Sequence, residues 1–286
     1  MKTRILTALV LLAAVLLWLF PAQYPVFTIG ALFIYMTAAY ELGPLLGFAS
    51  RVPFVLLALL AMTACFYLYP PGLYPVLGVP EEIQWIICLA LPFWVLLGPL
   101  VAIFPAGSGW LAHRVLGSLA GLAMILPYGL ALLYLRSLNY AEQEFDGAWL
   151  LLSIMLLVWA CDSGAYFTGR ALGHTPLLPR VSPNKTREGL YGGLVLALLC
   201  YALCDYAAVY APLQAGRAVL AGAACAGIAA AVLGDLAESM LKRRAGLKDS
   251  GRLFPGHGGM LDRVDSQLAA VPVFTAVCLL GEGRLL

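Results

Sequence analysis

The chain has 286 residues, of which 62% are hydrophobic and only 11% are charged, and its mean hydropathy is +0.90. A soluble domain carries about a quarter charged residues, and one of this length could not hide so much apolar surface in a single core. The composition therefore excludes a water-soluble globular protein and indicates a lipid bilayer as the surrounding medium. The formal net charge of +2 is too small to suggest a nucleic-acid partner.

Nine stretches are long and apolar enough to cross a bilayer, which takes about 20 mostly apolar residues. They lie near residues 4–20, 25–45, 53–70, 84–104, 115–136, 148–168, 189–210, 216–236 and 262–281. We therefore predict an all-α, polytopic integral membrane protein with about nine transmembrane helices. We expect the first stretch to be retained rather than cleaved as a signal peptide, because its apolar run is longer than a usual h-region and no A-x-A site follows it.

Basic residues are divided unequally between the two sides of this predicted bundle. The side of the N-terminus collects fourteen lysine and arginine residues, and the opposite side only three. Since cytoplasmic loops are enriched in these residues, we expect the N-terminus to be cytoplasmic, together with two long polar connections, 169–188 and 237–261. A bacterial-type inner membrane is the expected location.

The predicted spans divide the chain into two regions. Residues 1–140 hold spans 1–5, and residues 141–286 hold spans 6–9 with both long polar connections. Polar residues with the chemistry of an active site gather in the second region.

The most informative stretch begins where span 8 leaves the membrane. Asp235, Glu238, Ser239 and Lys242 have the spacing i, i+3, i+4 and i+7, which places them on one face of a helix. Gly246 is expected to end that helix, because glycine commonly follows a helix C-terminus. One helix end thus offers two carboxylates, a hydroxyl and an ammonium group.

A glycine-rich loop joins this helix to span 9. It contains Lys248, Asp249, Gly251, Pro255, Gly256, His257, Gly258 and Gly259, and span 9 opens with Asp262, Arg263, Asp265 and Ser266. Such a loop can present backbone N–H groups to phosphates, and carboxylates from both helices could hold Mg²⁺ against phosphate oxygens. The alternative is a juxtamembrane loop that attracts anionic lipid headgroups, but the five acidic residues from 235 to 266 would weaken such a patch.

A second polar cluster lies at the inner end of span 6 and in the connection that follows. Asp162 interrupts an apolar run, and Lys185 lies in the polar connection. An ionisable group inside a span is costly and usually has a function or a partner, so pairing with an arginine is the alternative for Asp162. Glu41, near the inner end of span 2, is equally open to a functional and a structural interpretation.

At these residues the sequence resembles the CDP-diacylglycerol synthases, also called phosphatidate cytidylyltransferases. The family signature has the form S-x-x-K-R-x4-K-D-x-G-x2-x-P-G-H-G-G-x-x-D-R-x-D, and every fixed position is filled here between Ser239 and Asp265. The upstream segments Asp162–Phe167 and Ser182–Gly189 also resemble the family, with Arg187 where the family usually has tryptophan. The resemblance covers roughly the C-terminal half of the chain.

The resemblance implies transfer of the cytidylyl group from CTP to phosphatidic acid in the bilayer, with release of pyrophosphate and a requirement for Mg²⁺. The expected catalytic residues are Asp235, Asp262, Lys242, Lys248 and Asp249. The expected substrate contacts are Ser239, Arg243, His257, Gly258, Gly259, Arg263, Lys185 and Asp162. The expected metal ligands are Asp235 and Asp262, with Asp265 and Glu238 as weaker candidates.

Two other functions are weighed against this one. A CDP-alcohol phosphotransferase would also use metal and phosphates, but its D-G-x2-A-R…G-x3-D-x3-D pattern is absent. A transporter would place polar residues near mid-membrane in several spans, whereas here they gather at the inner ends. Small residues in span 8 allow close helix packing, which leaves a homodimer open without requiring one.

Overall fold

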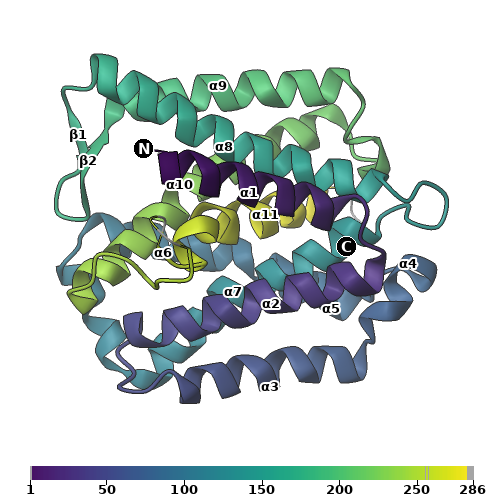
Figure 1. Ribbon diagram of the computed structural model, residues 1–286, viewed down its shortest axis with the longest axis horizontal. Coiled ribbons are helices and arrows are strands. Elements are labelled where there is room, and N and C mark those ends of the chain that lie inside the picture. Colours follow the sequence, from purple (N-terminus) through teal and green to yellow (C-terminus); the bar gives the residue numbers. More distant parts are fainter. Residues whose placement is uncertain (1, 255, 257, 282–286) are drawn as a thin grey trace.

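The computed structural model describes residues 2–254, 256 and 258–281 and is dominated by long helices (Figure 1). The α-helices are α1 Lys2–Leu19, α2 Tyr24–Leu45, α3 Val52–Leu68, α4 Tyr74–Leu77, α5 Glu81–Cys88, α6 Ala90–Ala102, α7 Arg114–Ser137, α8 Asp146–Leu172, α9 Arg187–Tyr206, α10 Arg217–Ala245 and α11 Leu261–Gly281. Three short 3₁₀ helices, η1 Pro71–Leu73, η2 Ala106–Ala112 and η3 Ala211–Leu213, lie between them. The predicted all-α membrane architecture is confirmed.

Seven helical stretches are long and apolar enough to cross a membrane within the described residues. The number is eight if α3 and the segment Pro71–Leu77, which meet at a bend of 44°, form one span, and α1 adds a shorter apolar helix from Leu9 to Leu19. Eight of the nine predicted stretches each correspond to one helix and the stretch 84–104 to the consecutive helices α5 and α6, while the count of nine crossings stays a prediction.

The C-terminal helix α11 occupies the centre of the bundle. It packs against α10, α7, α5, α6, α8 and α2, and 72% of its span is buried, compared with 17% for α9. Its first turn carries part of the polar stretch identified in the sequence. The chain thus places the end of its signature sequence where most of the other helices meet.

Two helices extend beyond the predicted span ends. α8 continues to Leu172 and α10 to Ala245, so the start of each predicted polar connection is helical. Gly246 ends α10 as expected, with a left-handed φ of 68° and with its N–H donating to the carbonyl of Arg243.

The first polar connection also contains a small antiparallel sheet that the sequence analysis did not predict. Strand β1 Pro176–Leu178 pairs with β2 Ser182–Thr186, and Thr186 then caps α9 by accepting a hydrogen bond from the N–H of Gly189. In Figure 1 this hairpin and the C-terminal end of α10 lie toward one end of the bundle, and α4 lies at the other end. The two polar connections are therefore neighbours in space.

At the α4 end of the bundle, a fully buried arginine joins three segments. The Nη1 of Arg136 donates to the carbonyl of Glu144 at 2.7 Å, and its Nη2 lies 3.4 Å from the carbonyl of Ala22. The guanidinium also lies 4.8 Å from the ring centroid of Tyr140 and 5.8 Å from that of Phe27. Arg136 therefore connects the end of α7 to the loop that follows α1 and to the loop that precedes α8.

We expect Arg136→Met to lower the free energy of unfolding by about 1.5–3 kcal/mol, because buried carbonyls lose a charged donor. The measurement is the thermal unfolding midpoint of the purified protein in detergent. Arg114→Met, at the exposed opposite end of α7, is the matched control and should leave the midpoint unchanged. Equal shifts for the two variants would show that Arg136 does not hold these segments together.

Candidate functional site

The ends of α10 and α11 are joined by a shared ammonium group. Lys242 forms ion pairs with Glu238, one turn earlier on α10, and with Asp262 on α11, where the Nζ to Oδ1 distance is 2.7 Å. The Glu238 side chain is 1% exposed and that of Asp262 is 7% exposed. Because removing one partner of such a cluster leaves a buried charge without compensation, the three groups depend on one another.

The second carboxylate oxygen of Asp262 is held by the glycine-rich loop. Its Oδ2 accepts hydrogen bonds from the backbone N–H of Ser250 at 2.9 Å, from the Ser250 hydroxyl at 2.8 Å and from the N–H of Gly259 at 2.8 Å. The sequence analysis expected these loop amides to face phosphates. In the structure, two of them instead orient a carboxylate of the protein.

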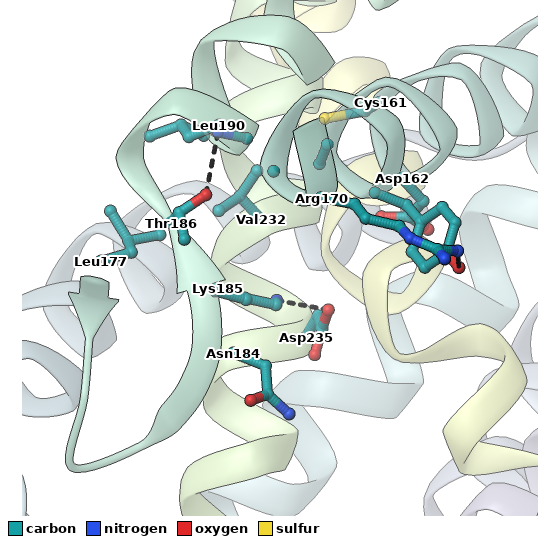
Figure 2. Close-up of a pocket in the computed structure, with 14 residues that line it drawn as sticks. Cys161, Asp162, Arg170, Leu177, Asn184, Lys185, Thr186, Leu190, Val232 and Asp235 are labelled. Carbon is teal, nitrogen blue, oxygen red and sulfur yellow. Dashed lines mark hydrogen bonds and ion pairs between the residues drawn. The ribbon is translucent and has the colours of Figure 1, made fainter. Parts of the chain in front are cut away.

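A second ion pair lies one to two turns earlier on α10. Lys185, from strand β2, pairs with Asp235, and both side chains are more than a quarter exposed (Figure 2). The Ser239 hydroxyl lies 3.4 Å from the other oxygen of Asp235. The residues predicted to form one stripe on α10 therefore belong to two centres, with Asp235 and Ser239 in one and Glu238 and Lys242 in the other.

A cavity of about 440 Å³ opens beside the Lys185–Asp235 pair, between α8, the hairpin, α9 and α10 (Figure 2). The polar residues that line it are Asp162, Tyr166, Arg170, Asn184, Lys185, Thr186 and Asp235. The apolar side chains of Leu177, Leu190 and Val232 complete other parts of the wall. A cavity with both kinds of lining can receive an amphipathic molecule or two molecules of different polarity.

Carboxylates from three helices lie near one another here, and two of them, Asp162 and Asp235, line the cavity. Asp162 on α8, Asp235 on α10 and Asp265 on α11 are near enough to repel one another electrostatically. Lys185 and Arg263 attract Asp162, although no ion pair to it occurs in the described part of the chain. The alternative of a simple arginine pair at Asp162 therefore has no support in the geometry.

Other predicted residues lie around these two centres. Arg243 donates from Nε to the carbonyl of Val181 at 3.3 Å and so connects α10 to the hairpin, while the carbonyl of Gly258 accepts the N–H of Phe254. Lys248 and Asp249 on the loop and Arg263 on α11 are exposed. The predicted contact His257 lies outside the described residues.

Several residues near the site were missed or left undecided by the sequence analysis. Asn184, Tyr166 and Arg170 line the cavity, and the Nη1 of Arg170 donates to the hydroxyl oxygen of Tyr166 at 3.2 Å. Glu41 reaches the loop from α2, as described below. The sequence feature that could have identified Glu41 is the presence of a carboxylate within an otherwise apolar span.

The oxygen donors of this site suit a magnesium ion that arrives with phosphates. No three histidine, cysteine or acidic side chains are close enough together, within residues 2–254, 256 and 258–281, to form a complete metal site. Mg²⁺ does not require one, since it usually keeps several waters and binds through one or two carboxylates plus substrate phosphates. The Oε1 of Glu238 is buried without a hydrogen-bond partner, and the carboxylates outnumber the lysines paired with them. This excess of negative charge fits a divalent cation.

Comparison with known proteins matches nearly the whole chain. Residues 2–280 match the family described as "Cytidylyltransferase family". A phosphatidate cytidylyltransferase of Haemophilus influenzae is 38% identical over 96% of this chain and 97% of its own length. One of Pseudomonas aeruginosa is 36% identical over 97% of this chain and 96% of its own length, and one of Brucella suis is 43% identical over 60% of this chain and 57% of its own. The chain belongs to the cytidylyltransferase family.

Proposed function

We propose that this membrane enzyme is a phosphatidate cytidylyltransferase, which transfers CMP from CTP to phosphatidic acid and releases pyrophosphate and CDP-diacylglycerol. The observation that carries the proposal is the cavity toward the C-terminal ends of α8 and α10, where charged and apolar walls meet. One substrate is a lipid and the other is water-soluble, and a site at the ends of spanning helices can be reached by both. The names of two relatives that align over nearly their full length support the same reaction.

The chemistry requires positioning more than proton transfer. A phosphate oxygen of phosphatidic acid attacks the α-phosphorus of CTP, and the bond to the departing pyrophosphate breaks. Because this nucleophile is already ionised, no general base is needed. The protein must then hold two anions in line against their repulsion, which calls for cations at fixed positions.

The residues of the two centres and of the loop would divide this work. Asp235 and Asp262 would hold Mg²⁺, with Asp265 and Glu238 as weaker ligands, and the ion would offset the charge of the triphosphate. Lys185 lies at the cavity wall and is the lysine best placed to bind a phosphate. The remaining predicted phosphate contacts are Lys242, Arg243, Lys248 and Arg263, and the predicted nucleotide contacts are Ser239, Asp249 and His257.

Family membership favours this function over the two alternatives. It indicates cytidylyl transfer, whereas a CDP-alcohol phosphotransferase would need a sequence pattern that the chain lacks. A transporter would use polar groups in mid-membrane, while both ion-paired centres lie near the cytoplasmic ends proposed for α10 and α11.

The direct test is incubation of the purified protein with CTP, phosphatidic acid and Mg²⁺, with pyrophosphate and CDP-diacylglycerol as the measured products. Chelation of the metal should abolish turnover and added Mg²⁺ should restore it. Asp235→Asn and Asp262→Asn should each lower kcat at least about 100-fold, the scale for loss of one key electrostatic group.

Asp205→Asn, near the opposite end of α9, is the control and should leave kcat unchanged. Each variant is also checked for an unaltered elution profile, because Asp262 anchors the loop as well. Wild-type-like turnover in Asp235→Asn would remove this residue from the proposed metal site. Absence of product from the wild-type protein would refute the proposed function.

The two site lysines should respond differently to neutralisation. Lys185→Gln breaks an ion pair whose members are both partly exposed, so the protein should fold normally. If Lys185 binds a phosphate, kcat/KM should fall roughly 10- to 150-fold, which corresponds to about 1.5–3 kcal/mol for a hydrogen bond to a charged group. Arg187→Gln, two residues away and exposed, is the matched control and should stay near wild type.

Lys242→Gln should instead act mainly on stability, because it leaves the buried Glu238 without its counter-charge. We expect the free energy of unfolding to fall by about 3–5 kcal/mol, the cost of breaking a buried pair. Thermal midpoints of the two lysine variants measure the contrast. A larger loss of stability in Lys185→Gln than in Lys242→Gln would contradict this assignment.

We propose that the site faces the cytoplasm, from the distribution of basic residues. Single cysteines at the exposed positions Arg180 and Arg252, in a cysteine-free background, should react with impermeant reagents only from the cytoplasmic side. A cysteine at Gln143, between α7 and α8, should react only from the opposite side. Labelling of positions 143 and 252 from the same side would overturn the proposed orientation.

A further inference from the structure

A buried carboxylate from the N-terminal half of the chain reaches the loop between α10 and α11. Glu41, on α2, is 4% exposed, and its Oε2 accepts hydrogen bonds from the backbone N–H of Leu261 at 2.7 Å and from the hydroxyl of Ser250 at 3.1 Å. Residues 246–260, which contain Ser250, are called the signature loop below. Glu41 thus touches this loop near its beginning and at the residue that follows its end.

We propose that Glu41 is a positioning residue that holds the signature loop, and through it Asp262, in the geometry needed for cytidylyl transfer; this role rests on the proposed function. Ser250 makes the connection. Its hydroxyl lies within hydrogen-bond distance of both the Glu41 and the Asp262 carboxylate, so the two share its single proton, and its backbone N–H donates to Asp262 as well. A shift of the loop away from Glu41 would therefore carry two donors of Asp262 with it.

Two glycines of the loop show how closely it fits around this carboxylate. A Cβ atom at Gly251 or at Gly259 would overlap the carboxylate oxygens of Glu41. Gly259 also donates its N–H to Asp262. Glycine at these positions allows the backbone to approach Glu41 on one side while it binds Asp262 on the other.

The charge of Glu41 distinguishes this contact from ordinary packing. Within the described residues it forms no ion pair, and neutral hydroxyl and amide donors are its recorded hydrogen-bond partners. Burial of a carboxylate without a counter-ion is costly, and an apolar side chain of similar size would pack at lower cost. What an apolar side chain could not do is accept hydrogen bonds from the loop.

The first test measures the loop directly, by hydrogen–deuterium exchange of the full-length protein in detergent. Glu41→Met keeps the approximate size and removes both acceptor oxygens, so exchange in segment 247–261 should accelerate at least about tenfold, the equivalent of one lost hydrogen bond to a charged group. Glu41→Gln keeps one acceptor oxygen and should remain closer to wild type than Glu41→Met. Thr37→Val, one turn earlier on α2, is the matched control and should leave the segment unchanged.

The variant Gly251→Ala tests the same contact between Glu41 and the signature loop by a change in the loop. Its added methyl group would displace the Glu41 carboxylate, so this variant should reproduce the faster exchange without altering Glu41 itself. Unchanged exchange of the segment in Glu41→Met would overturn the proposal. So would an equal acceleration over all helices, because that pattern reports general destabilisation.

The second test measures cytidylyl transfer by the same variants. Glu41→Met should lower kcat at least about tenfold, and Glu41→Gln should recover part of the loss. A kcat within about threefold of wild type in Glu41→Met despite a loosened loop would refute the positioning role. If the wild-type protein makes no CDP-diacylglycerol, the proposed function fails, while the exchange experiment still decides whether Glu41 holds the loop.

Discussion

The site is organised around the ammonium group of Lys242, which lies between a carboxylate of its own helix and one of the next. This arrangement fixes how far apart the ends of α10 and α11 can be, and the loop that joins them must close within that distance. About two turns earlier on α10, a Cβ at Gly234 would overlap the carbonyl of Asp265, so the two backbones approach closely there as well. Because α11 is also the most buried of the candidate spans, the other helices pack around the pair formed by α10 and α11.

Much of the helical fold could be predicted from the sequence, and the errors in the predicted ends of α8 and α10 have a common physical cause. Apolar length identifies the part of a helix that lies in lipid, but a helix continues until its backbone is interrupted. This is why α10 extends past the predicted end near 236 and continues as far as Gly246, and why α8 continues to Leu172. The β1–β2 hairpin had no comparable signal, because its strands are three and five residues long and lack regular alternation.

The residue types of the site were predictable, but their partners were not. Helical periodicity correctly grouped Asp235, Glu238, Ser239 and Lys242, yet it cannot say which neighbouring element each side chain meets. Lys185 and Asp235 are separated by 50 positions in the sequence, and Glu41 and Ser250 by 209. Such pairings depend on the packing of helices far apart in the chain. The N-terminal region, which carried no recognisable motif, thus contributes a direct contact to the motif of the C-terminal region.

Under the proposed function, the Lys185–Asp235 pair would give the cavity a selectivity that neither residue would provide alone. Before substrates arrive, each charge is already satisfied by the other. Under the proposed function, a lone metal cation would have to compete with a lysine for Asp235, and a lone nucleotide would have to compete with an aspartate for Lys185. A nucleotide that already carries its metal would offer a phosphate to Lys185 and a cation to Asp235 at the same time. The ion pair could then be replaced without leaving either charge unpaired. Under the proposed function, the pair would therefore favour a nucleotide and metal that arrive together over either one alone.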